Sequence, residues 1–203
     1  RTMPLPESTF EIVLAHRVCL ESSGDIARGM IECASLDFGA QTLSSDNTGL
    51  AQAVRTATSE TRKNLYRLAG GLKALQATVG NNVLGELKAD SYCLQNPIKA
   101  TFERQPQGLL RAYLHFLTAL DQGMLLMDAA VTGGLADRRR RNRFVKRSSS
   151  FLLSALRRIH SAHADVFSLV QSSFDTPENC LPVTSKALGI QFDRLPGLAV
   201  VKF

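Results

Sequence analysis

Apolar residues recur at alternating steps of three and four along three stretches of this chain. The steps are unbroken in the middle stretch, at Leu110, Tyr113, Leu117, Leu120, Met124, Met127 and Val131. An earlier stretch has Leu65, Leu68, Leu72, Leu75 and Val79, and a later one has Leu152, Ala155, Ile159, Ala162, Val166 and Leu169. Side chains at these steps share one face of an α-helix. The pattern predicts helices from about Thr48 to Val79, from Gln107 to Thr132, and across Gly134 to Gln171.

A further helix is predicted near the N-terminus. Ser8 and Glu11 have the spacing of a capping box, which marks a helix start. We expect this helix to run from Thr9 to about Ser35, with a kink near Ser22–Asp25. The segment 38–49 is rich in Gly, Ser, Asn and Asp and therefore predicts a loop.

These helices, with narrow seams and short connections, predict an all-α fold. We expect an antiparallel bundle of about four long helices with a non-helical C-terminal tail. Residues 1–175 would form the helical bundle domain. Residues 176–203 contain prolines that stop the last helix, and this tail would pack on the bundle or on a partner. Two short segments stay open, since 98–102 can be a first helical turn and 188–203 can contain a strand.

Positive charge is concentrated in the last predicted helix. Between Leu135 and His160 there are nine Lys and Arg and one acid, a net charge of +8 in a chain whose total is +6. The cations are Arg138, Arg139, Arg140, Arg141, Arg143, Lys146, Arg147, Arg157 and Arg158. Most stand near a helix N-terminus, where the macrodipole disfavours positive charge. Stability alone would not select this arrangement, so we interpret these residues as anion-binding.

Two kinds of anionic partner fit this basic stretch. Arginine clusters neutralise phosphates and release counterions, which gives salt-dependent binding to nucleic acid. The same cluster can dock on an acidic membrane surface at about 1 kcal/mol per basic residue, with Phe144 and Phe151 on its side of the helix. A solvated helix end without any partner is the alternative explanation of the charge.

The function that follows is that of a non-enzymatic helical structural or interaction protein. Its basic helix face, at about 138–158, would dock on nucleic acid or an acidic membrane surface. Its helix seams or its apolar C-terminal tail would mediate self-assembly or the docking of a protein partner. No transmembrane segment is expected, because the longest apolar stretch, 109–131, is interrupted by charged residues.

Catalytic patterns are missing from the sequence. It contains no Gly-x-Ser-x-Gly, no phosphate-binding Gly-rich loop, no His-Glu-x-x-His and no Cys-x-x-Cys. We therefore predict no catalytic residues, no cofactor and no metal. An enzyme or metal-binding bundle stays an alternative, because His160 and His163 share a helix face near Asp165, with His115 on another helix.

The cysteines support a second alternative. Cys19 and Cys33 fall on one predicted helix, about 20 Å apart if it is continuous, which is too far for a disulfide. Cys93 and Cys180 flank the last two helices at one end of the bundle, so a bridge between them is geometrically reasonable. Such a bridge would suit a secreted, cytokine-like four-helix protein that binds a receptor.

The lack of a visible secretory signal and of an Asn-x-Ser/Thr sequon favours an intracellular location, which is otherwise undetermined.

Overall fold

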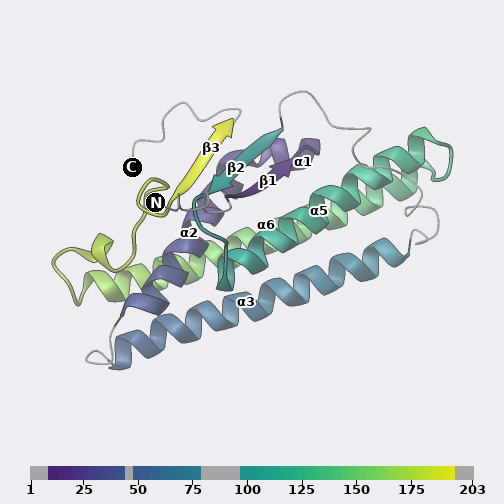
Figure 1. Ribbon diagram of the computed structural model, residues 1–203. Helices are drawn as coiled ribbons and strands as arrows, with labels where there is room; N and C mark the ends of the chain where they lie inside the picture. The colour runs from purple at the N-terminus through teal and green to yellow at the C-terminus, as the bar shows by residue number, and fades with distance from the viewer. Residues whose placement is uncertain (1–8, 44–47, 79–96, 195–203) are drawn as a thin grey trace, which may run out of the picture.

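Four long helices form the body of the protein in the computed structural model, which describes residues 9–43, 48–78 and 97–194 (Figure 1). They are α2 (Ser23–Thr42), α3 (Thr48–Ala77), α5 (Gly108–Thr132) and α6 (Arg138–Gln171). Each of the four contacts the other three. The predicted all-α bundle is thus confirmed, and the helices expected at Thr48, Gln107–Thr132 and Gly134–Gln171 are all present.

The core of the bundle is made by the predicted seams. Leu65 and Leu72 of α3, Leu120 of α5, and Leu152 and Ile159 of α6 are fully buried or nearly so. The helix α5 is buried on more than one side, because Leu109, Leu114 and Phe116 are also inaccessible to solvent. A helix that is apolar over most of its circumference belongs at the centre of a bundle.

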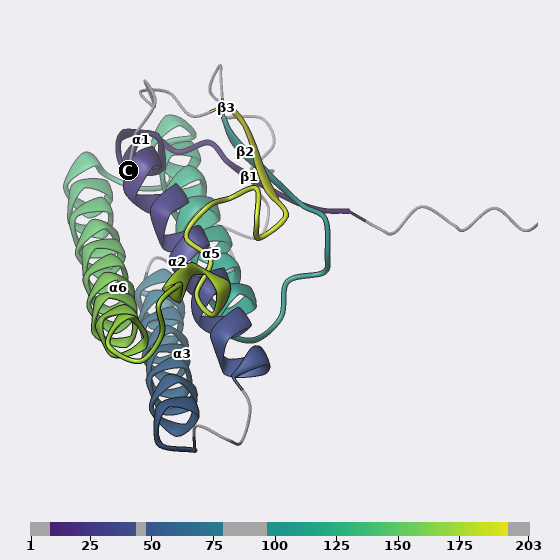
Figure 2. The same ribbon diagram turned by 90° about the vertical axis from the view of Figure 1, so that its left-hand side faces the viewer.

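A small antiparallel sheet covers one side of this bundle (Figure 2). Its strands, in the order β1-β2-β3, are β1 (Phe10–Leu14), β2 (Ile98–Phe102) and β3 (Ile190–Arg194). Phe10 pairs with Phe102 and Leu14 with Ile98, while Phe102 also pairs with Ile190 on the other side. The sheet therefore joins the beginning, middle and end of the chain.

The helix expected from Thr9 to Ser35 is wrong in its first half. Residues 10–14 form β1, then the short helix α1 (Arg17–Glu21) follows, and α2 begins only at Ser23. Ile12 and Leu14 are buried whereas Glu11 and Val13 are exposed, which is the period-two pattern of a half-buried strand. The loop expected from residue 38 is also wrong, because α2 continues to Thr42.

The two open segments are strands in the structure. Residues 98–102 are β2, whose burial alternates, and not a first turn of α5. Within the tail, the 3₁₀ helix η3 (Pro177–Asn179) is followed by β3, which pairs with β2. Leu181 is fully buried. The apolar residues after 194 lie outside the described part of the chain.

Two carboxylates, the buried Asp121 and the half-buried Asp37, connect the sheet and its adjoining segments to the helices. The Asp121 carboxylate of α5 accepts hydrogen bonds from the backbone amides of Ala15 (3.0 Å) and His16 (2.8 Å), at the β1–α1 junction. The Asp37 carboxylate of α2 accepts hydrogen bonds from the backbone amides of Leu109 (2.9 Å) and Leu110 (2.8 Å). These amides belong to the first turn of α5, where no carbonyl of the same helix can accept from them. Burial raises the pKa of both carboxyls, although these amides partly offset the effect.

The glycine pair inside α3 marks a close approach to α6. A Cβ atom added at Gly71 would lie 3.0 Å from the ring of Phe151 on α6, whereas one added at Gly70 would meet nothing within 4 Å. A close crossing of α3 and α6 therefore explains the glycine at position 71. Gly70 faces open space and has no packing reason to be glycine.

These neighbouring glycines predict opposite responses to alanine. Gly70→Ala should raise the free energy of unfolding by about 0.5–1 kcal/mol, because alanine is the better helix former and the site is open. Gly71→Ala gains the same propensity but must displace Phe151, so it should be less stable than Gly70→Ala by on the order of 1 kcal/mol. Urea denaturation of both variants measures the difference, and equal stabilities would contradict the close contact.

Candidate anion-binding surface

The helix α6 is divided lengthwise into an apolar and a basic side. Its buried positions include Phe144, Leu152, Ala155, Ile159 and Val166, which face the other helices. The opposite side carries the exposed cations Arg138, Arg139, Arg140, Arg143, Lys146, Arg147, Arg157 and Arg158. The predicted anion-binding residues thus share one solvent-facing side, with Arg141 as the half-buried exception.

The N-terminus of α6 is built to tolerate its cations. Asp137 is the N-cap, and its side chain accepts a hydrogen bond of 2.7 Å from the backbone amide of Arg140. This bond, with nearby Arg140 and Arg143, lowers the pKa of Asp137. A carboxylate at this position interacts favourably with the positive end of the helix dipole and partly neutralises the neighbouring positive charges.

Arg141 is committed to a contact within the fold. Its Nε donates to Asp128 Oδ1 of α5 at 2.7 Å, and the other carboxylate oxygen of Asp128 lies 3.3 Å from His16 Nε2. The amide of Val18 donates to His16 Nδ1, so the proton of a neutral His16 is on Nε2, facing Asp128. Burial raises the pKa of Asp128, but His16 and Arg141 outweigh it and lower the pKa to about 2. Arg141 therefore positions α6 and is not a free anion ligand.

The two phenylalanines of α6 are not on the outer side. Phe144 is 3% exposed and belongs to the core, and Phe151 is half-buried against Gly71 of α3. The prediction that they accompany the cations toward a membrane is therefore wrong. Both lie at the border of the apolar seam, and packing of α3 and α5 against that border covers them.

The helix α3 brings further cations beside α6, which the charge pattern along the chain did not reveal. Glu60 of α3 lies 3.6 Å from Arg158 of α6, and Gly71 of α3 packs on Phe151. Lys63 and Arg67 are exposed and continue the stripe from Glu60 to Gly71 at steps of three and four. They are therefore placed between two points at which α3 touches α6.

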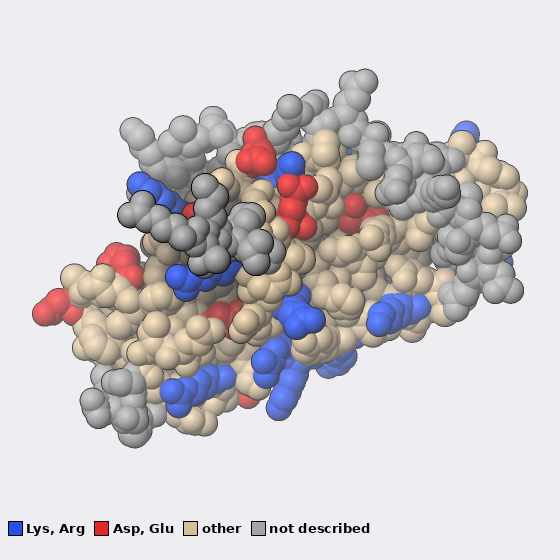
Figure 3. All heavy atoms as spheres, in the orientation of Figure 1, with Lys and Arg blue, Asp and Glu red and all other residues tan. Residues whose placement is uncertain are grey.

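Charge is consequently distributed unevenly over the molecule. Together α3 and α6 hold fourteen Lys and Arg and two acids, a net charge of +12, so the rest of the chain sums to −6. In Figure 3, Lys and Arg follow the edge formed by α3, while Asp and Glu gather over the sheet and near the end of α6. The Glu60–Arg158 pair is long and exposed, so it contributes little and leaves Arg158 accessible.

The His160–His163 pair connects α6 to α2. His160 Nδ1 contacts the buried carboxylate of Glu32, which also accepts a 2.8 Å hydrogen bond from Arg28 Nε. Burial would raise the pKa of Glu32, but these partners hold it below its ordinary value. The buried His163 lies 3.2 Å from Ser35 Oγ, and burial lowers its pKa. His115 is exposed, and within the described ranges no three His, Cys, Asp or Glu side chains group as metal ligands.

Only one of the two cysteines of the predicted disulfide lies in the described part of the chain. Cys180 is half-buried with a free thiol, and Cys93 lies outside the described residues. Cys19 and Cys33 are buried and unpaired, as expected, although they lie on α1 and α2 and not on one helix. Burial raises the pKa of both thiols, which keeps them protonated and inert.

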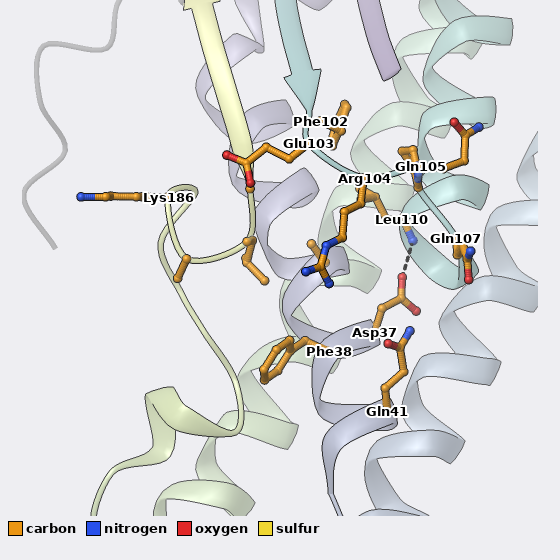
Figure 4. A pocket seen from close by; sticks show the side chains of 15 residues that line it. Asp37, Phe38, Gln41, Phe102, Glu103, Arg104, Gln105, Gln107, Leu110 and Lys186 are labelled. Carbon is orange, nitrogen blue, oxygen red and sulfur yellow. Dashed lines mark hydrogen bonds between the residues drawn. The ribbon is translucent and has the colours of Figure 1, made fainter. Parts of the chain in front are cut away.

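A pocket of about 550 Å³ lies between α2, the β2–α5 connection and the segment before β3 (Figure 4). Its lining carries both signs of charge, from Glu103 and Asp37 and from Arg104 and Lys186. Both oxygens of Asp37 already accept amide hydrogen bonds from α5. That carboxylate therefore has a structural role. The mixed charges of the lining do not indicate one chemical class of ligand for the pocket.

Comparison with known proteins supports the fold. No family model matches the chain, and no curated protein matches its sequence. Its structure is similar to the crystal structure of selenomethionine-containing AcaB from uropathogenic E. coli, with a TM-score of 0.59 and 13% sequence identity. The likeness covers 86% of this chain and 88% of that one. At this identity the likeness concerns the fold alone. None of the helices in the described ranges has the length and hydropathy of a membrane span.

The Arg141–Asp128–His16 contact predicts a pH-dependent contribution to stability. The folded-state pKa of Asp128 is lowered to about 2, so its stabilisation is present above the unfolded pKa and is lost as the pH falls below about 4. Since Asp128 is one-third exposed, we expect Asp128→Asn to lower the free energy of unfolding at neutral pH by only about 1 kcal/mol.

Denaturant unfolding between about pH 7 and pH 3 measures this contribution, and the deficit of the variant should shrink as the pH falls. Asp165→Asn, on the exposed side of α6, is the control and should change stability little at any pH. A deficit of Asp128→Asn that is constant with pH would contradict the ionic nature of the contact.

Proposed function

We propose that this protein is a non-enzymatic interaction protein that binds nucleic acid through the exposed basic side of α6. The observation that carries the proposal is the separation of the two sides of this helix. Its apolar side is used by the bundle, whereas its eight exposed cations form no buried contact. Arginine forks are suited to phosphate oxygens, and such a surface gains affinity by releasing counterions.

Nucleic acid is favoured over an acidic membrane surface because the apolar anchors are absent from this side. A peripheral helix binds a bilayer by burying apolar side chains in addition to its charge. Phe144 and Phe151 are turned into the bundle, and Leu153 is the large hydrophobic side chain exposed between the first and last of these cations, with Leu135 and Leu169 exposed beyond them at either end. Each of these leucines supplies about 1.5–3 kcal/mol at most. They are spread from the residues before α6 to its last turn, so they do not form one patch that could anchor a rigid domain.

Self-assembly through the helix seams has less support. The seam residues Leu72 of α3, Leu120 of α5 and Ile159 of α6 are each at most 1% exposed. A seam that is already buried inside one chain is not available to a second copy. The apolar end of the tail, which was the other candidate for partner docking, lies outside the described residues.

The test removes three exposed arginines whose side chains form no hydrogen bond or ion pair with the described residues. Arg139→Ala/Arg143→Ala/Arg147→Ala should make the negative slope of the log of the binding constant against log salt shallower by about 2.7. Each neutralised phosphate contributes roughly 0.9 to the magnitude of that slope. Binding of the full chain to labelled DNA, to RNA and to anionic vesicles is measured by anisotropy or co-sedimentation. Circular dichroism checks that helicity is unchanged.

The matched control removes three exposed arginines from other parts of the chain, as Arg17→Ala/Arg104→Ala/Arg111→Ala. It has the same net charge as the test variant, so it separates a local surface from a general charge effect. Parent-like binding by the α6 variant, or equal losses of affinity in both, would refute the proposal. Binding to vesicles and not to nucleic acid would replace it with the membrane alternative.

A further inference from the structure

We infer that the nucleic-acid partner is double-stranded, and that α3 supplies a second row of phosphate contacts beside α6. This inference rests on the proposed function of α6 and adds the surface of a second helix to it. Three features favour a duplex: the paired rows of cations, the lack of a row of stacking residues, and the width of the surface. The surface reads the phosphate backbone and not the base sequence.

The first feature is a pair of antiparallel basic stripes. Arg147, Phe151, Ser154 and Arg158 form the stripe of α6 toward α3, because Phe151 packs on Gly71 and Arg158 lies near Glu60. The facing stripe of α3 is Glu60, Lys63, Arg67 and Gly71. Lys63 and Arg67 have no carboxylate within ion-pair distance among the described residues. They therefore add two cations beside the contact between α3 and α6, which Arg147 and Arg158 border from the other helix.

The second feature is the composition of this surface. Proteins that bind single strands combine cations with exposed aromatic rings on which bases stack. The aromatic side chains of α6 nearest the cations are Phe144, which is buried, and Phe151, which forms the floor of the seam. Tyr66 of α3 is exposed and lies three residues after Lys63, but one ring at the edge of the stripe offers a single stacking position and not a row of them. The surface thus contacts phosphates without a platform for bases.

The third feature is width. A single α-helix, which is about 10–12 Å across, fits the major groove, whose width is about 12 Å. Between Phe144 and His163, however, α6 has neighbours on both flanks. On one flank Phe151 contacts α3, and on the other His163 contacts Ser35 of α2. Neighbouring helix axes lie about 8–10 Å apart, so this surface is too broad to enter a groove and must lie across the backbone.

The length of the surface suits the regular spacing of a duplex. The exposed cations from Arg139 to Arg158 extend over about 28 Å at 1.5 Å per residue. A duplex of that length presents phosphates about every 3.4 Å on each strand at fixed positions, so rigid rows of cations can meet several at once. A single strand would lose conformational entropy to reach the same contacts. The net negative charge of the rest of the chain favours binding with this face toward the duplex.

The test compares Lys63→Ala/Arg67→Ala with Arg62→Ala/Lys73→Ala in the full chain. Both variants remove two cations from α3, but Arg62 and Lys73 lie on another stripe of that helix. The probes are a DNA duplex of about 20 base pairs, its separate strands, and a duplex of scrambled sequence, each titrated at several salt concentrations.

We expect the parent protein to bind the duplex about tenfold more tightly than either strand, and the scrambled duplex as tightly as the original. Lys63→Ala/Arg67→Ala should make the negative salt slope for duplex shallower by about 1.8 and weaken binding at least tenfold. The control variant should change both the slope and the affinity much less. Equal affinity for single strands, a strong preference between the duplexes, or equal effects of both variants would overturn the inference.

The two proposals fail in different ways. If the α6 triple variant weakens binding but Lys63→Ala/Arg67→Ala behaves as its control does, the role of α3 is refuted and the proposed function stands. If neither variant weakens binding, both are refuted. Preferential binding to anionic vesicles over duplex would also overturn both.

Discussion

The structure depends on the burial of the apolar side of α6 against the other three long helices. Phe151 of this helix packs on α3, His160 and His163 contact α2, and Phe144 lies close to Gly123 of α5. Removing these apolar side chains from water is the main favourable term, at roughly 25 cal/mol per Å². Because a helix is rigid, fixing one side fixes the other. The cations, which cannot be buried without partners, must then stand together in solvent.

This arrangement carries an electrostatic cost that the fold only partly offsets. Like charges at steps of three and four destabilise a helix by about 0.2–0.5 kcal/mol each, and the dipole at the N-terminus adds to the repulsion. Asp137 caps the first turn and Asp128 pairs with Arg141, so two carboxylates act at this end. No described carboxylate lies within ion-pair distance of Arg139, Arg143 or Arg147. An anionic partner would remove the repulsion that remains.

The sequence predicted the helices whose apolar residues repeat without interruption. The body of α5 was placed within one residue of its observed start, because its three-four steps leave no other register. The N-terminal segment failed for a physical reason: Phe10, Ile12 and Leu14 alternate as in a strand, but the Ser8–Glu11 spacing suggested a helix cap. A strand also needs a partner, and β2 comes from a distant part of the chain that gave no strong signal of its own.

The proposed anion-binding surface was predictable only in the part that is local in sequence. The cations of α6 follow one another along the chain, so their common side could be read from helical periodicity. Lys63 and Arg67 look like ordinary solvent-facing residues of α3, and only the contacts at Glu60 and Gly71 place them beside α6. The same packing turned Phe144 and Phe151 inward, although the sequence pattern put them on the side of the cations. Residues at the border of an amphipathic helix are decided by its neighbours, so a surface made by two helices emerges only from tertiary packing.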